Sequence, residues 1–172
     1  MSVNYSDLTP GTAVTWMNTG GDKAMLLKNL ANGGIREGVK SATLVDGTKG
    51  FPEVLEVTVE TKLGSAAADG TQLNIHLGWS SSATAGTDNP GGLTGADAAV
   101  ADADQLPQID FIGSLVCSSS LGTGVQRQVL WCVPKKEYVV PVLQNASGVS
   151  TSNVDSETKI TVRPWYRRNP IA

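Results

Sequence analysis

Residues 54 to 63 alternate between apolar and polar side chains. Leu55 and Val57 fall on one side of an extended chain, whereas Glu56 and Thr58 fall on the other. Successive side chains of a strand point to opposite faces, so this period of two predicts a strand with one face on a core. A strand that is half buried is typical of antiparallel sheets. The alternation therefore predicts an all-β fold.

Similar patterns extend over most of the chain. A second alternating run, Thr71 to Trp79, places His76 on the face toward solvent. Weaker runs bounded by Gly, Ser, Pro or Asn predict further strands. They cover residues 13–17, 24–30, 108–117, 125–133, 137–145 and 157–166. So many strands joined by turns predict one antiparallel β-sandwich, and in particular a jelly roll.

Two parts of the chain are less regular. Residues 80–106 combine turn composition with an Ala-rich stretch, which predicts a long loop carrying one short helix. Residues 1–50 are expected to form either an N-terminal arm or extra strands packed on the sandwich. The sandwich itself is assigned to residues 51–172. No shift in composition divides the chain, so we expect a single domain.

The run from residue 137 to 145 is apolar on both faces and contains Pro141, which cannot donate a ladder hydrogen bond. We therefore expect an edge strand whose second face is covered by something else. Residues 125–133 show a weaker form of the same pattern, with Trp131 on one face and Leu130 on the other. The first candidates for a protein interface are Tyr138, Val140, Pro141 and Leu143.

The C-terminal part interleaves arginine with aromatic residues. These residue types concentrate binding energy at protein interfaces, although they also stack on nucleic-acid bases. A net charge of -3 favours a protein partner over nucleic acid. A packed strand end is the third interpretation. The candidate interface residues here are Arg163, Trp165, Tyr166, Arg167 and Arg168.

Groups for catalysis are sparse. The chain has one histidine, His76, and it lies in an ordinary amphipathic strand. Cys117 and Cys132 lie in apolar strands, where a thiol acts as a small hydrophobe, and a disulfide between them stays open as an alternative. We expect no enzyme and no cofactor. A glycosidase or esterase site assembled only in three dimensions is the alternative.

The nearest approach to a metal site is the acidic group Asp97, Asp102 and Asp104. Carboxylates at alternate positions bind calcium only with further oxygen ligands, which the sequence does not supply here. A solvated loop, with aspartate capping a short helix, is the expectation. The first residues resemble no signal peptide, and no run approaches the about 20 apolar residues that span a bilayer. We expect neither secretion nor a membrane partner.

Three stretches together carry a family resemblance: LPQIDFIGSLVCSSS, VQRQVLWCVPKKEYVVPVLQNAS and ITVRPWYRRN, within residues 106–169. They resemble in style the jelly-roll cement or decoration proteins of tailed-bacteriophage capsids. The resemblance implies a virion protein that reaches the capsid from the host cytoplasm. It implies binding between major capsid subunits as a homodimer or homotrimer, without catalytic residues.

Two alternatives stay open beside the capsid. One is a carbohydrate-binding β-sandwich module that uses Trp79, Trp131 or Trp165, because sugar faces stack on aromatic rings. The other is a component of the phage tail or of the joint between head and tail.

Overall fold

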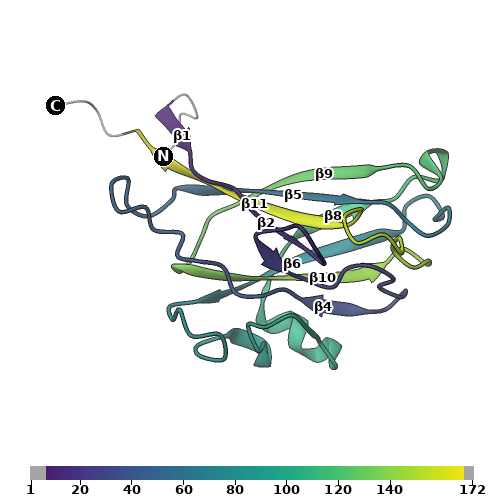
Figure 1. Cartoon of the computed structure of the whole chain (residues 1–172), viewed down its shortest axis with the longest axis horizontal. Coiled ribbons are helices and arrows are strands. Elements are labelled where there is room, and N and C mark those ends of the chain that lie inside the picture. Colours follow the sequence, from purple (N-terminus) through teal and green to yellow (C-terminus); the bar gives the residue numbers. More distant parts are fainter. Residues whose placement is uncertain (1–6, 169–172) are drawn as a thin grey trace.

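The computed structural model describes residues 7–168, so the outer ends of the predicted segments 1–50 and 51–172 lie outside it. Two β-sheets pack face to face (Figure 1). The alternation in residues 54–63 has the expected cause, because Leu55, Val57 and Val59 are completely buried between the sheets. The prediction of an all-β sandwich is confirmed.

The six predicted strands that follow residue 50 form within two residues of their expected bounds. They are β5 (Val54–Thr61), β6 (Gln72–Ser80), β8 (Asp110–Val116), β9 (Gln126–Cys132), β10 (Tyr138–Ala146) and β11 (Lys159–Arg167). The N-terminal part supplies β1 (Leu8–Pro10), β2 (Val14–Met17), β3 (Lys23–Ala24) and β4 (Ile35–Glu37). The strand predicted for residues 24–30 is wrong beyond Ala24, although Met25 and Leu27 are buried in the core.

The strand order is that of a jelly roll. In the first sheet, sheet A, the order is β3-β2-β11-β5-β9, and β1 also pairs with β11. In the second, sheet B, it is β7-β4-β10-β6-β8, where β7 is the short strand Ala98–Ala99. Without the short strands β1, β3 and β7, four strands of sheet A face four of sheet B, as two wrapped Greek keys require.

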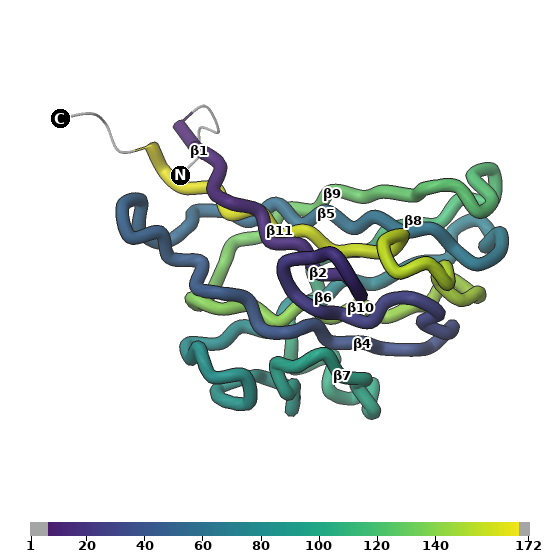
Figure 2. Tube along the Cα trace, viewed as in Figure 1, coloured from purple at the N-terminus to yellow at the C-terminus, as the bar shows by residue number. Residues whose placement is uncertain are grey.

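The N-terminal part of the described chain belongs to both sheets. β1 and β2 pair antiparallel with the last strand, β11, and β4 pairs with β10. Figure 2 shows the purple N-terminal trace following the yellow C-terminal strand. First and last strands therefore lie side by side in sheet A.

Residues 81–109 cover the outer face of sheet B and bury a second, smaller core. Val140 and Val142 of β10 have no exposed surface there. They share this core with Ile35, Leu93, Val100, Leu106 and Ile109. The contact is close at Gly78 of β6, because a Cβ added there would lie only 2.6 Å from Leu93 Cδ1.

This second core corrects the prediction for β10. The strand is apolar on both faces, as predicted, but it lies in the middle of sheet B between β4 and β6, and not at an edge. Pro141 is tolerated because its carbonyl accepts from the Gly38 amide (2.9 Å), just beyond the last residue of β4. The N–H and C=O of a strand residue point the same way, so the missing donor faces the side where the β4 ladder has ended.

The segment that covers sheet B has no helix at its Ala-rich centre, which forms β7 instead. Its helical turns are the 3₁₀ helices η2 (Pro90–Gly92) and η3 (Ala103–Gln108); a third, η4 (Ser119–Leu121), joins β8 to β9. Asp102 caps η3 by accepting from the Asp104 amide (2.9 Å), as the loop interpretation of these acids expects. Within residues 7–168, no helix has the length and apolar composition needed to cross a membrane.

Candidate functional site

The two outer faces of the sandwich differ. Residues 81–109 lie on the β4 side of the molecule, away from β5 and β9 (Figures 1 and 2). The outer face of sheet A is thus left to solvent, with Arg163 of β11 exposed and Trp131 of β9 49% exposed. Because residues 7–168 cover one face and leave the other open, sheet A offers the candidate binding face.

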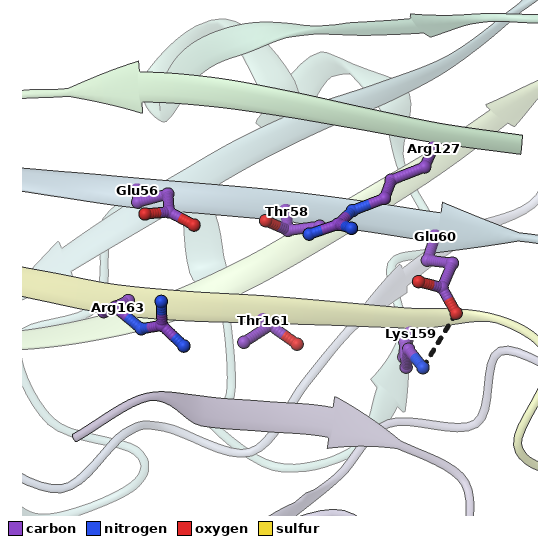
Figure 3. Close-up of a pocket in the computed structure, with 7 residues that line it drawn as sticks. All are labelled: Glu56, Thr58, Glu60, Arg127, Lys159, Thr161 and Arg163. Atoms are coloured by element: carbon purple, nitrogen blue, oxygen red, sulfur yellow. Dashed lines mark ion pairs between the residues drawn. The ribbon is translucent and has the colours of Figure 1, made fainter.

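Side chains on this face form rows across β11, β5 and β9. The strand register places Lys159, Glu60 and Arg127 in the first row, Thr161, Thr58 and Val129 in the second, and Arg163, Glu56 and Trp131 in the third. Figure 3 shows the charged and threonine side chains projecting from their strands on the same side. The rows follow from the period of two, since odd-numbered β11 and β9 residues share a face with even-numbered β5 residues.

Short side chains in the middle row create a shallow groove of about 190 Å³. The groove has longer charged side chains on both sides, and its floor includes Thr58 and Thr161. The row extends onto β2, where the Thr15 hydroxyl lies 3.1 Å from that of Thr161. We call this depression the sheet A groove; its lining residues are Glu56, Thr58, Glu60, Arg127, Lys159, Thr161 and Arg163.

The groove carries three cations and two carboxylates. Lys159 Nζ lies 2.8 Å from Glu60 Oε1, the ion pair drawn in Figure 3. Arg127 and Arg163 form no ion pair with any residue between 7 and 168. The groove is therefore weakly positive on a chain of net charge -3. Two guanidinium groups are available to acceptors on a partner.

Two tryptophans lie at one end of the groove. The rings of Trp131 and Trp165 have centroids 6.0 Å apart and are tilted by 51°. Trp165 Nε1 donates to Glu56 Oε2 (3.2 Å), which ties the aromatic pair to the third row. Trp79 lies elsewhere, because it is buried in the core and donates to Asp110 (2.7 Å).

The predicted interface residues of the C-terminal part divide by the face of β11. Arg163 and Trp165 lie on the candidate face, and Arg167 is exposed with an ion pair to Glu53 (3.4 Å). Arg168, just past the strand, is also exposed. Tyr166 points inward instead and is buried, so it is corrected to a core residue. Its hydroxyl donates to the carbonyl of Leu44 (2.8 Å).

The other predicted interface residues lie inside the chain. Val140 and Leu143 have no exposed surface, and Pro141 is buried with them, while Tyr138 is half-buried at the start of β10. Their prediction as interface residues rests on the apolar character of both faces of β10. That pattern is explained by two internal cores, so Val140, Pro141 and Leu143 do not form a surface for a partner.

The structure also corrects the environment of His76. The residue is on the outer face of sheet B, but it is only 7% exposed and packs against the Phe111 ring, with centroids 5.3 Å apart. Neither ring nitrogen has a hydrogen-bond partner within residues 7–168. Burial lowers the pKa of this imidazole. No nucleophile or orienting group is therefore hydrogen-bonded to the His76 ring within the described residues.

The remaining chemistry-bearing residues are dispersed. Cys117 and Cys132 are both free thiols, and burial, followed by the charge of Asp110, raises the pKa of Cys132 to about 12. Asp97 is bound by Arg36 (2.6 Å) and does not converge with the η3 cap. Among the described residues, no group of three or more His, Cys, Asp or Glu is placed to hold a metal ion.

Sequence reasoning missed most of the groove. Glu60, Lys159 and Arg127 carry no local motif, and their alternation only marks them as facing outward. Their proximity depends on which strands pair, with β5 between β11 and β9. A comparison with known protein families finds no family model that matches this chain, and a comparison with curated proteins finds no matching sequence.

Proposed function

We propose that this protein is a structural virion component that binds the outer capsid surface between major capsid subunits and stabilises the shell, without catalysis. The observation that carries the proposal is the outer face of sheet A, which residues 7–168 leave open and which carries the tryptophan pair and two arginines without an ion pair to any of these residues. Arginine and tryptophan dominate the binding energy of protein interfaces. The proposal also rests on the resemblance of residues 106–169 to capsid cement proteins.

The chemistry of the chain favours binding over catalysis. The only histidine is buried and kept neutral by its lowered pKa, and the thiol of Cys132 is held protonated. A jelly roll is also a common fold of viral capsid and lectin domains. Because one fold serves many functions, the proposal depends on the face and not on the fold.

The test uses capsids of a phage that carries this gene, prepared from a deletion strain so that they lack the protein. Purified protein should bind at a fixed number of copies per capsid and raise the temperature at which the shell ruptures. Arg127→Ala and Arg163→Ala should weaken binding together by about tenfold or more, because each removes a charged hydrogen-bond donor from the contact. Neither change removes an ion pair within residues 7–168.

The matched control is Lys28→Ala, which removes an exposed cation that pairs with Asp155 (2.8 Å) outside the groove. This variant should bind capsids as the wild type does. Failure of the wild-type protein to bind, or equal loss in all three variants, would contradict the proposal. Location of the protein at the tail or the head-tail joint by electron microscopy would assign it to that alternative.

A second candidate function, carbohydrate binding, is favoured by one observation. Trp131 and Trp165 form a partly exposed aromatic pair beside Glu56 and Arg163, which offer hydrogen bonds to hydroxyl groups. Trp79 is removed from this candidate set by its burial. A glycan array should then give hits that Trp131→Ala abolishes, whereas an array without hits rejects this function.

A further inference from the structure

Most of the large exposed apolar side chains in the described part of the chain lie along one side of the sandwich. Within residues 7–168, eight large hydrophobic residues are exposed; five of them lie on β8, on β9 or in the connection between these strands, and a sixth, Val133, directly follows β9. These six are Phe111, Val116, Leu121, Val125, Trp131 and Val133, and their exposed fractions run from 49% to 69%. Apolar clusters of this kind usually mark an interaction surface.

The same side carries two free strand edges. In the described part of the chain, β9 is the last strand of sheet A and pairs only with β5, and β8 is the last strand of sheet B and pairs only with β6. Natural sheets usually protect such edges with lysine, proline or other charged residues. In β9, Arg127 is the one charged residue. An edge left open in this way is ready to pair with another strand.

We propose that the edge formed by β8 and β9 is a homodimer interface, in which β9 pairs antiparallel with β9 of a second copy about a twofold axis at Val129. This interface borders the groove and shares Arg127 and Trp131 with the candidate face of sheet A, but the proposal does not depend on the proposed capsid role. The two sheets A of the dimer would then form one continuous sheet across the axis. A second copy is favoured because the sequence of β9 is complementary to itself in this register.

The complementarity between the two β9 strands involves the side chains on the outer face of sheet A. Antiparallel pairing about Val129 sets Val129 opposite its own copy, Val125 opposite Val133, and Arg127 opposite Trp131. The two exposed valines thereby gain apolar partners, and the arginine lies beside an aromatic ring, a favourable cation–π arrangement. Like charges do not meet in this register.

Other registers on the same face are poorer. Sliding one strand by two residues moves Val133 opposite either Thr123 or Arg127. Sliding it by four residues sets Arg127 opposite its own copy or opposite Lys135, and like charges directly opposed destabilise a strand pair. Among these registers, only the one centred on Val129 gives both valines an apolar partner without setting like charges opposite each other.

The second sheet fits the same axis. Gly113, in the middle of β8, lies under Leu130 of β9, because a Cβ added to the glycine would be 2.8 Å from the leucine side chain. A twofold axis at Val129 therefore passes near the centre of both edge strands. Phe111 lies near the start of β8 and Val116 at its end. In the dimer, Phe111 of one copy would therefore lie close to Val116 of the other copy. A single strand from a foreign protein would cover only one of the two edges.

The decisive experiment changes Val129, because the twofold axis sets this residue opposite its own copy. Val129→Lys and Val129→Glu each place two like charges opposite each other in the dimer, whereas in a single chain the residue is only half-buried on the outer face. Sedimentation and light scattering should show a dimer for the wild type and an about tenfold or larger increase in dissociation constant for each variant. An equimolar mixture of the two variants should dimerise again, because lysine then faces glutamate.

The matched controls are Val154→Lys and Val154→Glu, at a valine 46% exposed outside both edges, and both should stay dimeric. Circular dichroism melting verifies that each variant is folded. If a variant does not fold, hydrogen exchange of wild-type β9 amides replaces it, since their protection should fall on dilution. A wild type of single-chain mass, a trimer, or a dimer that neither Val129 variant weakens overturns the proposal.

Discussion

At the scale of the residue, the alternation rule assigns a face but not an environment. His76 alternates with inward-facing Ile75 and Leu77, as the sequence predicts, yet it is buried because its own sheet neighbour Phe111 packs over it. Both ring nitrogens lack a hydrogen-bond partner in the described chain, and a buried unpaired imidazole favours its neutral form. His76 therefore couples the stability of the fold to pH.

We predict that the free energy of unfolding decreases as the pH is lowered from 7 to 5. The unfolded chain binds the His76 proton near pH 6.5, whereas the folded chain binds it only at lower pH, since burial lowers its pKa. Below pH 6.5 the unfolded state holds more protons, so stability falls by up to about 2 kcal/mol at pH 5. His76→Leu should lack this loss in urea titrations at both pH values.

The carboxylates with strongly lowered pKa values do not account for a loss of stability between pH 7 and 5. The pKa of Asp46 is lowered to about 2 by hydrogen bonds from Thr48, and that of Asp88 to about 2 by the Ser81 amide and Lys136. Their stabilising contributions disappear as the pH falls below about 4. A wild type that loses no stability between pH 7 and 5, or a His76→Leu variant that loses as much, contradicts the prediction.

At the scale of the element, the segment that covers sheet B is held by a buried cation. Lys40 is 3% exposed, and its ammonium group donates to Ser80 Oγ (2.9 Å). It also donates to the carbonyl oxygens of Ser82 (3.0 Å), Thr84 (2.7 Å) and Thr87 (2.8 Å). The first part of the loop is therefore organised around one lysine and not by regular secondary structure.

Lys40→Met tests this organisation. Methionine keeps most of the apolar stem but removes all four hydrogen bonds, including the buried one to Ser80, so we expect a loss of about 2–3 kcal/mol. Amides of residues 81–89 should also exchange faster with solvent. The control Lys135→Met removes a lysine 61% exposed and its pair with Asp110, which should cost less than about 1 kcal/mol. Equal losses in both variants would reject the role of Lys40.

The same segment explains why the sequence of β10 predicts an edge strand although β10 lies inside sheet B. Sequence alone shows that Val140 and Leu143 lie on opposite faces and that both are apolar. It does not show that a loop of Gly, Ser and Ala residues supplies the second core, since Leu93, Leu106 and Ile109 are widely spaced and follow no period. The local pattern predicts that residues 137–145 form a strand. The position of this strand within sheet B depends on packing against residues that are far away in the sequence.

At the scale of the whole molecule, the sandwich was predictable because its long strands alternate, and Leu55, Val57, Leu73 and Ile75 are all completely buried as expected. The sheet A groove was less predictable. Arg163 and Trp165 stood out by composition, but Glu60 and Lys159 become neighbours only through the pairing of β5 with β11. Long-range pairing of this kind leaves no local trace in one sequence.

The closure of the fold provides the last prediction. Trp16 of β2, in sheet A, is completely buried, and its Nε1 donates to the carbonyl of Val39 (2.6 Å), which follows β4 of sheet B. The residue therefore joins the two sheets through the N-terminal part of the chain. Trp16→Phe loses this hydrogen bond and part of the buried ring, which should cost about 2–4 kcal/mol.

The control, Trp165→Phe, makes the same replacement on the outer face of sheet A, where Trp165 is only half-buried, and should cost about 1 kcal/mol or less. Urea unfolding followed by far-ultraviolet and near-ultraviolet circular dichroism separates two outcomes for Trp16→Phe. If the N-terminal strands are integral to the sandwich, both signals shift together to lower urea, because a two-state domain unfolds as one unit. If those strands behaved as an attached arm, the main transition would stay in place and only the amides near residues 8–24 would exchange faster.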